Sequence, residues 1–385
     1  MLDHGTNLSL GDDILSSLYI KNGKDVNNQD IELLIENGKI VQVSSHLSGI
    51  KADNELDLKQ RSFVSAGWID DHVHCFEKMS LYYDDPDKVG YETGVTTVID
   101  AGSTGADNID DFYRITRNKK TNVLAMINIS KTGILAQNEL DDLTKIQLKP
   151  LKDMIQKYPN FIVGLKARIS KSVVVDNGIE PLKLAKKIQK DLPEYLPLMI
   201  HIGTNPPELK DIFDLLEKGD IVTHCFNGKS NGILDNHHQI KSFVKSGLKK
   251  GIIFDVGHGT DSFNFRTAQI ATDENIAPQS LSTDIYHRNR EFGPVYNMAT
   301  CIEKMLILGY DLKDVITMIT KAPATNYHLK TKGSLQVGMD ADITVFNVKN
   351  KEKILVDSNG NECETHTIID PQYSIIAGQV YLLGE

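Results

Sequence analysis

The sequence predicts an α/β protein, built as a (β/α)8 TIM-like barrel beside a small discontinuous β-sandwich domain. Eight apolar segments rich in Val and Ile recur over residues 63–285 and alternate with helical patterns. Strand-and-turn sequence lies on both sides of this repeat, and neither side is long enough to form a good core alone. We therefore expect a barrel over residues 63–330, and a β-sandwich domain made from residues 1–62 and 331–385.

The first part of the chain predicts a small antiparallel β module. Residues 1–16 have the composition of a loose leader. Alternating apolar residues then predict strands, and Asn37-Gly38 between two apolar runs favours a tight hairpin. The expected strands cover residues 17–21, 31–36 and 39–43, and a fourth ends at residue 58.

The middle of the chain repeats the order strand, loop, helix. The expected strands are 63–70, 96–101, 123–129, 161–169, 196–202, 221–226, 251–256 and 280–285. The expected helices between them are 107–117, 141–157, 181–191, 207–218, 238–249 and 264–272. Eight such units favour a closed barrel. A doubly wound open sheet is the alternative, but no Gly-x-Gly-x-x-Gly follows the first strand.

The last part of the chain returns from helices to strands. Helical patterns cover residues 295–308, 312–319 and 323–327. From residue 333 onward the sequence again alternates like a β-sheet, with a strand at 343–346 and a turn at Asn359-Gly360-Asn361. This return to strands is the reason to pair the two ends of the chain in one domain.

Composition excludes some partners and favours a cytoplasmic enzyme. The formal net charge of −10 argues against a nucleic-acid or anionic-membrane partner. No apolar run approaches the roughly 20 residues that span a bilayer, and the N-terminus lacks a signal-peptide pattern. The four cysteines form no C-x-x-C pair, which suits free thiols in a reducing compartment. A small-molecule substrate is expected, and a homo-oligomer is possible.

His72-Val73-His74 follows the first apolar run of the expected barrel. Residues i and i+2 of a strand point to the same face, so both imidazoles should project together from the strand end. Neutral imidazole is the commonest nitrogen ligand for zinc and related metals. Two unrelated histidines are the alternative for this pair taken alone.

Four more expected strands end in residues that a metal site uses. They are Lys166, His201, His224 and Asp284. In a (β/α)8 enzyme the active site lies at these strand ends. Each residue has a simpler explanation, such as an ion pair for the lysine or a helix N-cap for the aspartate. A metal site explains all six residues at once, so we predict one here.

These residues resemble the ligand set of the amidohydrolase superfamily of metal-dependent hydrolases. The resemblance covers nearly the whole chain, including the ending Gly-Ser-Leu-x-Val-Gly-Met-Asp-Ala-Asp. It implies a binuclear site with two divalent ions, most often Zn2+. By this resemblance His72, His74 and Asp284 hold one ion, and His201 and His224 hold the other.

The resemblance also implies a chemical modification and a mechanism. Lys166 would react with CO2 to form a carbamate that bridges the two ions together with a hydroxide. A carbamate offers two anionic oxygens, whereas a protonated lysine has no lone pair for a cation. Asp284 would take a proton as the hydroxide attacks a carbonyl and then give it to the leaving group. The products would be a carboxylate and an alcohol or amine.

Four further residues are candidates for substrate binding. Arg168 lies two residues after Lys166, where a guanidinium suits a substrate carboxylate, although an ion pair with a loop acid is equally compatible. The other three stand in loops after strands, and they are Asn227, His258 and Tyr286. Arg290 and the loop over residues 101–105 are weaker candidates.

Within the superfamily the chain is most similar to a dihydroorotase-like subgroup. The similarity rests on Asp-Ala-Gly-Ser, Gly-Leu-Lys-Ala-Arg, Thr-His-Cys-Phe-Asn-Gly and Phe-Asp-Val-Gly-His-Gly. Relatives there resemble esterases of acetylated α-hydroxy acids. Dihydroorotases themselves resemble His-x-His-x-Arg, and this chain has Phe76 at the arginine position. Adenosine-type deaminases lack the lysine that corresponds to Lys166.

The expected function is therefore hydrolysis of an ester or amide bond in a small carboxylate-bearing substrate. A cyclic amidohydrolase of the dihydroorotase or hydantoinase kind is the alternative. A catalytically silent scaffold is a third possibility, but silent homologues tend to lose ligands and all six stand here.

Overall fold

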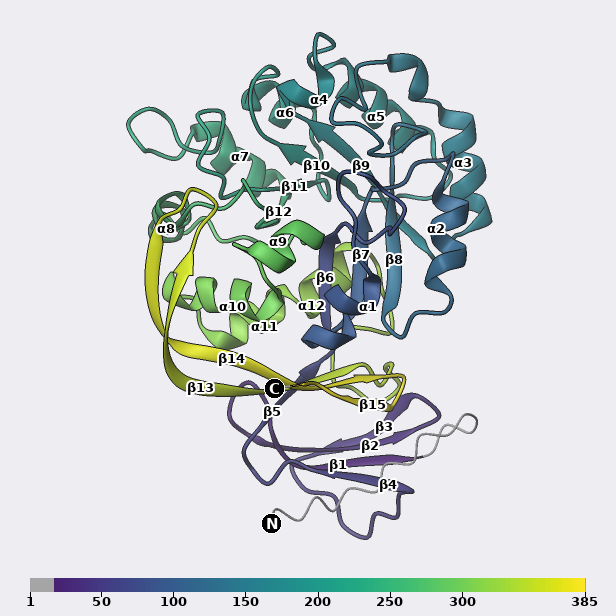
Figure 1. Ribbon diagram of the computed structural model, residues 1–385, viewed down its shortest axis with the longest axis vertical. Helices are drawn as coiled ribbons and strands as arrows, with labels where there is room; N and C mark the ends of the chain where they lie inside the picture. Colours follow the sequence, from purple (N-terminus) through teal and green to yellow (C-terminus); the bar gives the residue numbers. More distant parts are fainter. Residues whose placement is uncertain (1–16, 385) are drawn as a thin grey trace.

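Two β-sheets organise the protein. In the computed structural model, which describes residues 17–384, a curled parallel sheet of seven strands lies above a second sheet of eight strands (Figure 1). The leader expected over residues 1–16 lies outside the described residues. The parallel sheet and the helices around it form the predicted barrel, and segments from both ends of the described residues enter the second sheet.

The barrel sheet follows the chain from one strand to the next, and every neighbouring pair is parallel. Its strands are β6 (Trp68–Val73), β7 (Val95–Ala101), β8 (Asn122–Asn128), β9 (Ile162–Ile169), β10 (Leu198–Ile202), β11 (Ile221–Thr223) and β12 (Ile253–Phe254). All residues of β6 and β7 are buried, as expected for strands covered on both faces.

The eighth strand, expected over residues 280–285, is reduced to two single pairings. Ser280 pairs with Asp255 and Ile285 pairs with Val73, and these two contacts close the ring between β12 and β6. Asp284 has a left-handed backbone with φ of 49°, which interrupts an extended strand just before its end. The closed barrel is confirmed, but its last member is not a continuous strand.

The apolar run expected as one strand over residues 63–70 is two strands. β5 (Phe63–Ala66) pairs antiparallel with β13 (Ile343–Val356) in the second sheet, and β6 begins the barrel at Trp68. Gly67 between them lies against another strand, and a Cβ there would stand 2.1 Å from the Thr96 hydroxyl oxygen. The apolar pattern of the sequence does not reveal the break at Gly67, because the residues before and after it are buried and form one continuous apolar segment.

Helices surround the barrel sheet (Figure 1). They are α1 (Pro86–Val89), α2 (Ile109–Thr116), α3 (Leu148–Lys157), α4 (Lys171–Val174), α5 (Glu180–Asp191), α6 (Leu209–Leu215), α7 (Ser242–Lys250), α8 (Phe265–Asp273), α9 (His287–Phe292), α10 (Met298–Ile307), α11 (Leu312–Met318) and α12 (Lys321–Asn326). The six helices expected between strands are present with shifted ends. α3 begins later than expected, with Pro150 in its first turn, where its missing N–H costs nothing. Within residues 17–384, no helix has the length and apolarity to cross a membrane.

The second sheet joins the two ends of the chain. Its strand order is β15-β14-β13-β5-β1-β2-β3, and β4 pairs with β1. The bounds not yet given are β1 (Leu18–Lys24), β2 (Asp30–Glu36), β3 (Lys39–Ser44), β4 (Asn54–Asp57), β14 (Glu362–Ile376) and β15 (Gln379–Leu382). Asn37 and Gly38 both have positive φ between β2 and β3, as the hairpin prediction requires.

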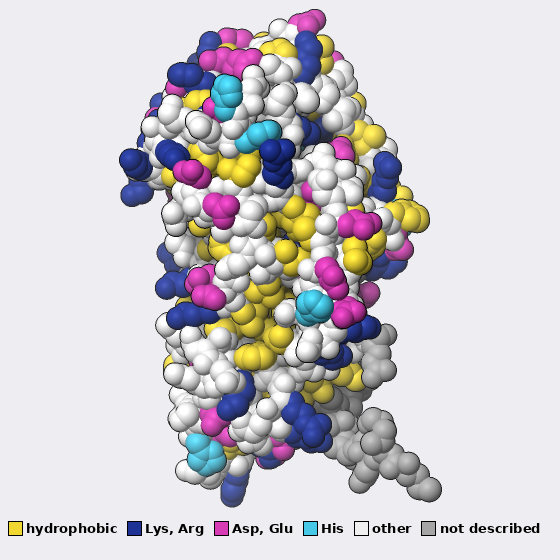
Figure 2. Space-filling model, turned by 90° about the vertical axis from the view of Figure 1, so that its left-hand side faces the viewer, with side chains coloured by type: hydrophobic (Ala, Val, Ile, Leu, Met, Phe, Trp, Pro, Cys, Tyr) yellow, Lys and Arg dark blue, Asp and Glu magenta, His cyan; other side chains and the backbone are white. Residues whose placement is uncertain are grey.

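The hairpin of β13 and β14 is long and leaves the second sheet. It rises beside α10 to the neighbourhood of α8 (Figure 1). Three apolar residues of β13 are exposed, and they are Val348, Ile354 and Val356. The molecular face on the side of this hairpin shows apolar side chains along its middle and charged ones nearer its edges (Figure 2). The turn at residues 357–361, which we call the hairpin tip, therefore stands next to the barrel rather than next to its own sheet.

Candidate active site

A cavity of about 790 Å³ opens at the C-terminal ends of the barrel strands. Five of the six predicted metal ligands line it, and they are His72, His74, Lys166, His201 and Asp284. The sixth, His224, lies directly behind them. Its ring centre is 4.5 Å from that of His201 and 5.1 Å from that of His72. The fold thus brings all six residues together.

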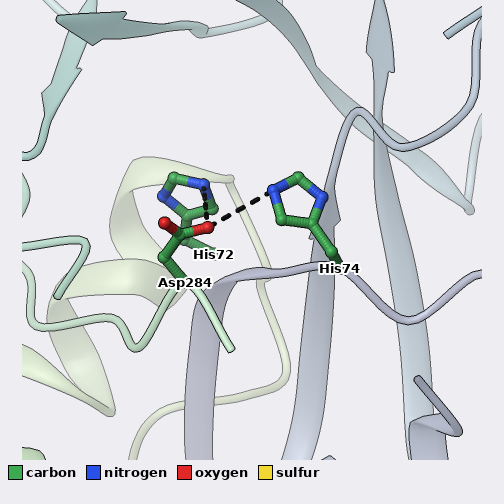
Figure 3. A group of neighbouring side chains, drawn as sticks. All are labelled: His72, His74 and Asp284. Atoms are coloured by element: carbon green, nitrogen blue, oxygen red, sulfur yellow. Dashed lines mark ion pairs between the residues drawn. The ribbon is translucent and has the colours of Figure 1, made fainter. Parts of the chain in front are cut away.

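His72, His74 and Asp284 form the tightest part of this group (Figure 3). Nε2 of each histidine is 3.3 Å from Oδ1 of Asp284. All three residues offer a ligand atom within 4.8 Å of the others. Two nitrogens and one carboxylate oxygen at this spacing suit zinc or a similar divalent ion.

Hydroxyl groups fix the orientation of these two imidazoles. His72 Nδ1 is 2.9 Å from the Thr223 hydroxyl, which donates to Asp255 at 2.7 Å. His74 Nδ1 is 2.9 Å from the Ser103 hydroxyl, which donates to Asp100 at 2.8 Å. Each hydroxyl donates its proton in a hydrogen bond to an aspartate, so each hydroxyl oxygen accepts a hydrogen bond from Nδ1–H. Both Nε2 atoms then keep their lone pairs for a metal.

His224 and His201 present a similar chemistry with fewer partners. Nδ1 of His224 donates to the Gly257 carbonyl at 2.6 Å, which leaves its Nε2 unprotonated. The His201 imidazole has no hydrogen bond within residues 17–384. Burial lowers the pKa of His72 and His201 well below the ordinary value, and it lowers the pKa of His224 to about 4. All three rings are therefore neutral at neutral pH, the form that binds metals.

Lys166 stands among these histidines without an acidic partner. Its Nζ is 3.0 Å from His72 Nε2 and 3.1 Å from Met199 Sδ, and the described residues give it no ion pair. Burial lowers the pKa of Lys166 to about 7. A substantial fraction of this amine is therefore unprotonated near neutral pH, and only an unprotonated amine has a lone pair to react with CO2.

The backbone is strained at two of these residues. His224 has φ of 68° and Asp284 has φ of 49°, values that residues other than glycine rarely adopt. Gly259 packs directly under Asp284, and a Cβ there would lie 2.4 Å from Asp284 Oδ2. The loop after β12 must therefore lack a side chain at this point.

Arg168 and Tyr286, two of the predicted substrate-binding residues, line the cavity. Arg168 Nη1 is 3.4 Å from Glu139 Oε2, and its guanidinium lies 5.6 Å from the centre of the Tyr82 ring. The described residues accept no hydrogen bond from this guanidinium. Burial raises the pKa of Glu139 to about 7, and the positive charge of Arg168 opposes this shift without overcoming it. Arg168 therefore faces both an acid and the cavity, so both sequence interpretations have support.

Two predicted substrate residues have other partners and do not line the cavity. The Asn227 amide donates to the His224 carbonyl at 2.8 Å. The His258 ring lies 2.7 Å from Lys304 Nζ and stacks on Phe263. Substrate binding by Asn227 and His258 stays a prediction.

Two other positions singled out in the sequence have partners outside the cavity. Arg290 pairs with Asp84 at 2.7 Å. Phe76 is buried against Phe112, with ring centres 5.2 Å apart, so it does not take the place of a substrate-binding arginine.

The sequence interpretation missed the groups behind the ligands. Thr223, Asp255 and Asp100 orient histidines, yet each reads as an ordinary strand residue. Ser103 lies in the loop 101–105, which the sequence marks only as a weaker candidate. Polar residues inside apolar strands are the signal that identifies such groups, because a buried polar side chain needs a partner.

Known proteins that are similar to this chain have the same fold, but they are described with different activities. A family model described as a deacetylase-like composite domain matches residues 335–381. A protein of Enterococcus faecalis named deacetylase is 54% identical over 94% of this chain and 98% of its own length. A crystal structure described as an adenine deaminase is 54% identical, with a TM-score of 0.93 over 95% of this chain and 99% of that one. Another, described as a dihydroorotase, is 32% identical, with a TM-score of 0.87 over 96% and 98%.

These relatives share the barrel, and the site described above has the donor atoms that a metal centre needs. The chain therefore belongs to the deacetylase family of the amidohydrolase superfamily and is a hydrolase.

Proposed function

We propose that the chain is a binuclear zinc hydrolase that cleaves an acyl group, in particular an acetyl group, from a small carboxylate-bearing ester or amide. The observation that carries this proposal is the convergence of four histidines, one lysine and one aspartate beside a cavity that Arg168 also lines. The name of the Enterococcus faecalis relative supports removal of an acetyl group.

The proposed metal binding uses the two parts of the ligand set. His72, His74 and Asp284 would hold one ion, and His201 and His224 would hold the other. A carbamate on Lys166 would connect them. The lowered pKa of the Lys166 amine and its lack of an acidic partner within the described residues support this modification, because both favour reaction with CO2.

Bound zinc would supply an activated water near neutral pH and polarise the substrate carbonyl. Asp284 would accept the proton released during attack at Oδ2, the oxygen that the two histidines leave free. Burial acts to raise the pKa of Asp284, but interactions with the surrounding histidines and Lys166 lower it overall, so this carboxylate is ionised and ready to accept. It would then return the proton to the departing oxygen or nitrogen.

Arg168 and two tyrosines would orient the substrate. A guanidinium fork binds a carboxylate through two parallel hydrogen bonds, and Arg168 has donors that no described residue uses. The Tyr82 and Tyr286 rings meet edge to face, 5.0 Å between centres, and form an apolar wall of the cavity. A small acid with one anionic end and one acyl group fits these surroundings.

Hydrolysis of a cyclic amide is the second candidate function. The 32% identical structure described as a dihydroorotase favours it, and the metal chemistry is the same. Phe76 argues against dihydroorotate itself, because its buried ring offers no charge for the substrate carboxylate. The structure described as an adenine deaminase adds adenine to the compounds worth testing.

The test is a hydrolysis assay with protein loaded with zinc in bicarbonate buffer. The panel contains O-acetyl α-hydroxy acids, N-acyl amino acids, cyclic amides including dihydroorotate, and adenine with ammonia release as its readout. Protein stripped by a chelator is the control. Turnover of acyclic acetyl compounds, with one enantiomer preferred, would support the proposal. Turnover of cyclic amides or adenine alone would replace it with the corresponding alternative.

A further inference from the structure

The loop over residues 257–262 contacts both strained metal-ligand positions. Gly257 accepts the hydrogen bond from His224 Nδ1. Gly259 lies against the Asp284 carboxylate, and its amide donates to the Thr283 carbonyl at 2.9 Å. A displacement of this loop would therefore change the orientation of one histidine and one acid at the same time.

The same loop forms part of the cavity wall. Thr260, Asp261 and Ser262 line the cavity, and the Thr260 hydroxyl is 3.1 Å from the Tyr286 hydroxyl. Nothing in the loop is helix or strand, and the backbone bonds of His258 and Gly259 to residues 282 and 283 hold only its first half. Further side-chain contacts reach the loop from the side away from the cavity.

His258 and Lys304 provide the first of these contacts. Both side chains are only 1% exposed. Lys304 Nζ donates to the Pro294 and Val356 carbonyls and lies 2.7 Å from His258 Nε2. These three acceptors use all three N–H groups of an ammonium. His258 Nδ1 is thereby the protonated nitrogen, and it donates to the Gly259 carbonyl at 2.9 Å.

The hairpin tip provides the second contact. The Ser358 hydroxyl donates to the same Gly259 carbonyl at 3.0 Å and accepts from the Phe263 amide at 3.1 Å. Asp357, which is 2% exposed, accepts from the Phe265 amide at 3.0 Å. Val356, at the end of β13, supplies the carbonyl for Lys304. The tip belongs to the segment that the deacetylase-like composite domain matches.

We propose that Lys304, acting through His258, and the hairpin tip together fix loop 257–262, so that the C-terminal hairpin positions His224 and Asp284 for the reaction. Lys304 and Ser358 are positioning residues, because neither lines the cavity. This inference rests on the proposed function in one respect, the roles of His224 and Asp284. It also gives His258 a place behind the loop rather than at the substrate.

The test compares Lys304→Met and Ser358→Ala with a matched control, Lys353→Met. Lys353 also ties the hairpin to α10, through Glu303 at 2.7 Å, but it makes no contact with the loop. All variants are made in the full chain. The readouts are hydrogen exchange of peptides covering residues 257–265, zinc affinity by chelator competition, and kcat and KM on the best compound of the panel.

For Lys304→Met we expect at least tenfold faster exchange in this loop. Zinc affinity or kcat should fall about 10-fold to 100-fold, the usual effect of losing a group that orients a ligand. KM should stay within about twofold, and Ser358→Ala should act in the same direction more weakly. Lys353→Met should lower the melting temperature and leave loop exchange and zinc affinity unchanged. Because Lys304 acts through His258, adding His258→Phe to Lys304→Met should cause little further loss.

The proposal is overturned if Lys353→Met reproduces the loop and zinc effects, or if Lys304→Met lowers only the melting temperature. If Lys304→Met does not fold, Ser358→Ala decides, and unchanged loop exchange in that variant overturns the proposal. If the unmodified chain hydrolyses no compound of the panel, the proposed function fails, while exchange and zinc affinity still decide this inference.

Discussion

The two parts of the ligand set differ in what holds them together. His72 and His74 both face the carboxylate of Asp284. Each of the two rings is also fixed by a hydroxyl group that an aspartate orients. His201 and His224 have no acid between them, and only His224 has a side-chain hydrogen bond within the described residues. The first part is therefore preorganised by the protein's own charges, and under the proposed function the second part depends on a carbamate at Lys166.

This difference indicates an order of assembly. An ion at His72, His74 and Asp284 meets three donors that are already close together. An ion at His201 and His224 meets two neutral rings and needs a further anionic ligand to be held well. We therefore expect the first position to bind zinc more tightly and the second to follow carbamate formation.

The largest expected effect is that of Lys166→Ala. The second ion and most activity should be lost, about 1,000-fold or more, because the proposed bridging ligand is gone while the first position keeps weakened binding. Zinc per chain and hydrolysis rate measure this. Short carboxylic acids such as formate or propionate should restore part of both by standing in for the carbamate. Full activity in the unsupplemented variant would exclude a bridging role for Lys166.

The next largest effect concerns the two hydroxyl groups that orient His72 and His74. Thr223→Val and Ser103→Ala should each lower zinc affinity or kcat about 10-fold to 100-fold, because the histidine loses the acceptor that fixes its tautomer. Each also removes one of the hydrogen bonds that Asp255 or Asp100 accepts. Thr223→Ser, which keeps the hydroxyl, is the control and should retain most activity. If Thr223→Val binds zinc as well as the unmodified chain, the first part is not preorganised as described.

Arg168→Met tests whether Arg168 binds the carboxylate of the substrate. Loss of a charged hydrogen-bond partner costs about 1.5–3 kcal/mol, so KM for anionic substrates should rise roughly 10-fold to 100-fold. The methyl esters of the same compounds should change little and serve as the control. An equal loss on acids and esters would remove Arg168 from carboxylate binding.

The smallest effect is a pH dependence of stability at Glu139. Its pKa in the folded protein is raised to about 7 by burial, above the unfolded value. Between these two pKa values the folded state binds more protons, so stability falls as pH rises, by up to about 1.4 kcal/mol per pH unit. Glu139→Gln should reduce this decline in melting temperature between pH 5 and 7. An identical pH profile in the variant would show that Glu139 does not titrate there.

The sequence predicted the barrel and the convergence of six candidate ligand residues, because both follow from simple geometry. Apolar runs of Val and Ile identify buried parallel strands, and the C-terminal ends of such strands meet at one mouth. Lys166, His201 and His224 could therefore be placed together without knowing any contact. The family resemblance is confirmed by relatives that span nearly the whole chain.

Other features depend on contacts that no local pattern carries. Loops have no periodic side-chain direction, so the sequence could not show that His258 turns toward Lys304 or that Asn227 bonds to its own loop. Glu139 and Arg168 are brought together only by the fold. Gly67 did offer a signal, since an isolated glycine inside a strand pattern marks a break or a close approach.

The pairing of β5 with β13 has a consequence for synthesis on the ribosome. Ser65 and Thr344 are neighbours in the second sheet but 279 residues apart in the chain. β5 is therefore synthesised long before its partner β13, and one of its edges stays unpaired until the whole barrel segment has been made. Pairings of such long range close slowly, and unpaired edges are prone to intermolecular association while they persist. Production of this chain should accordingly be more sensitive to chaperone supply and growth temperature than the stability of the finished fold implies.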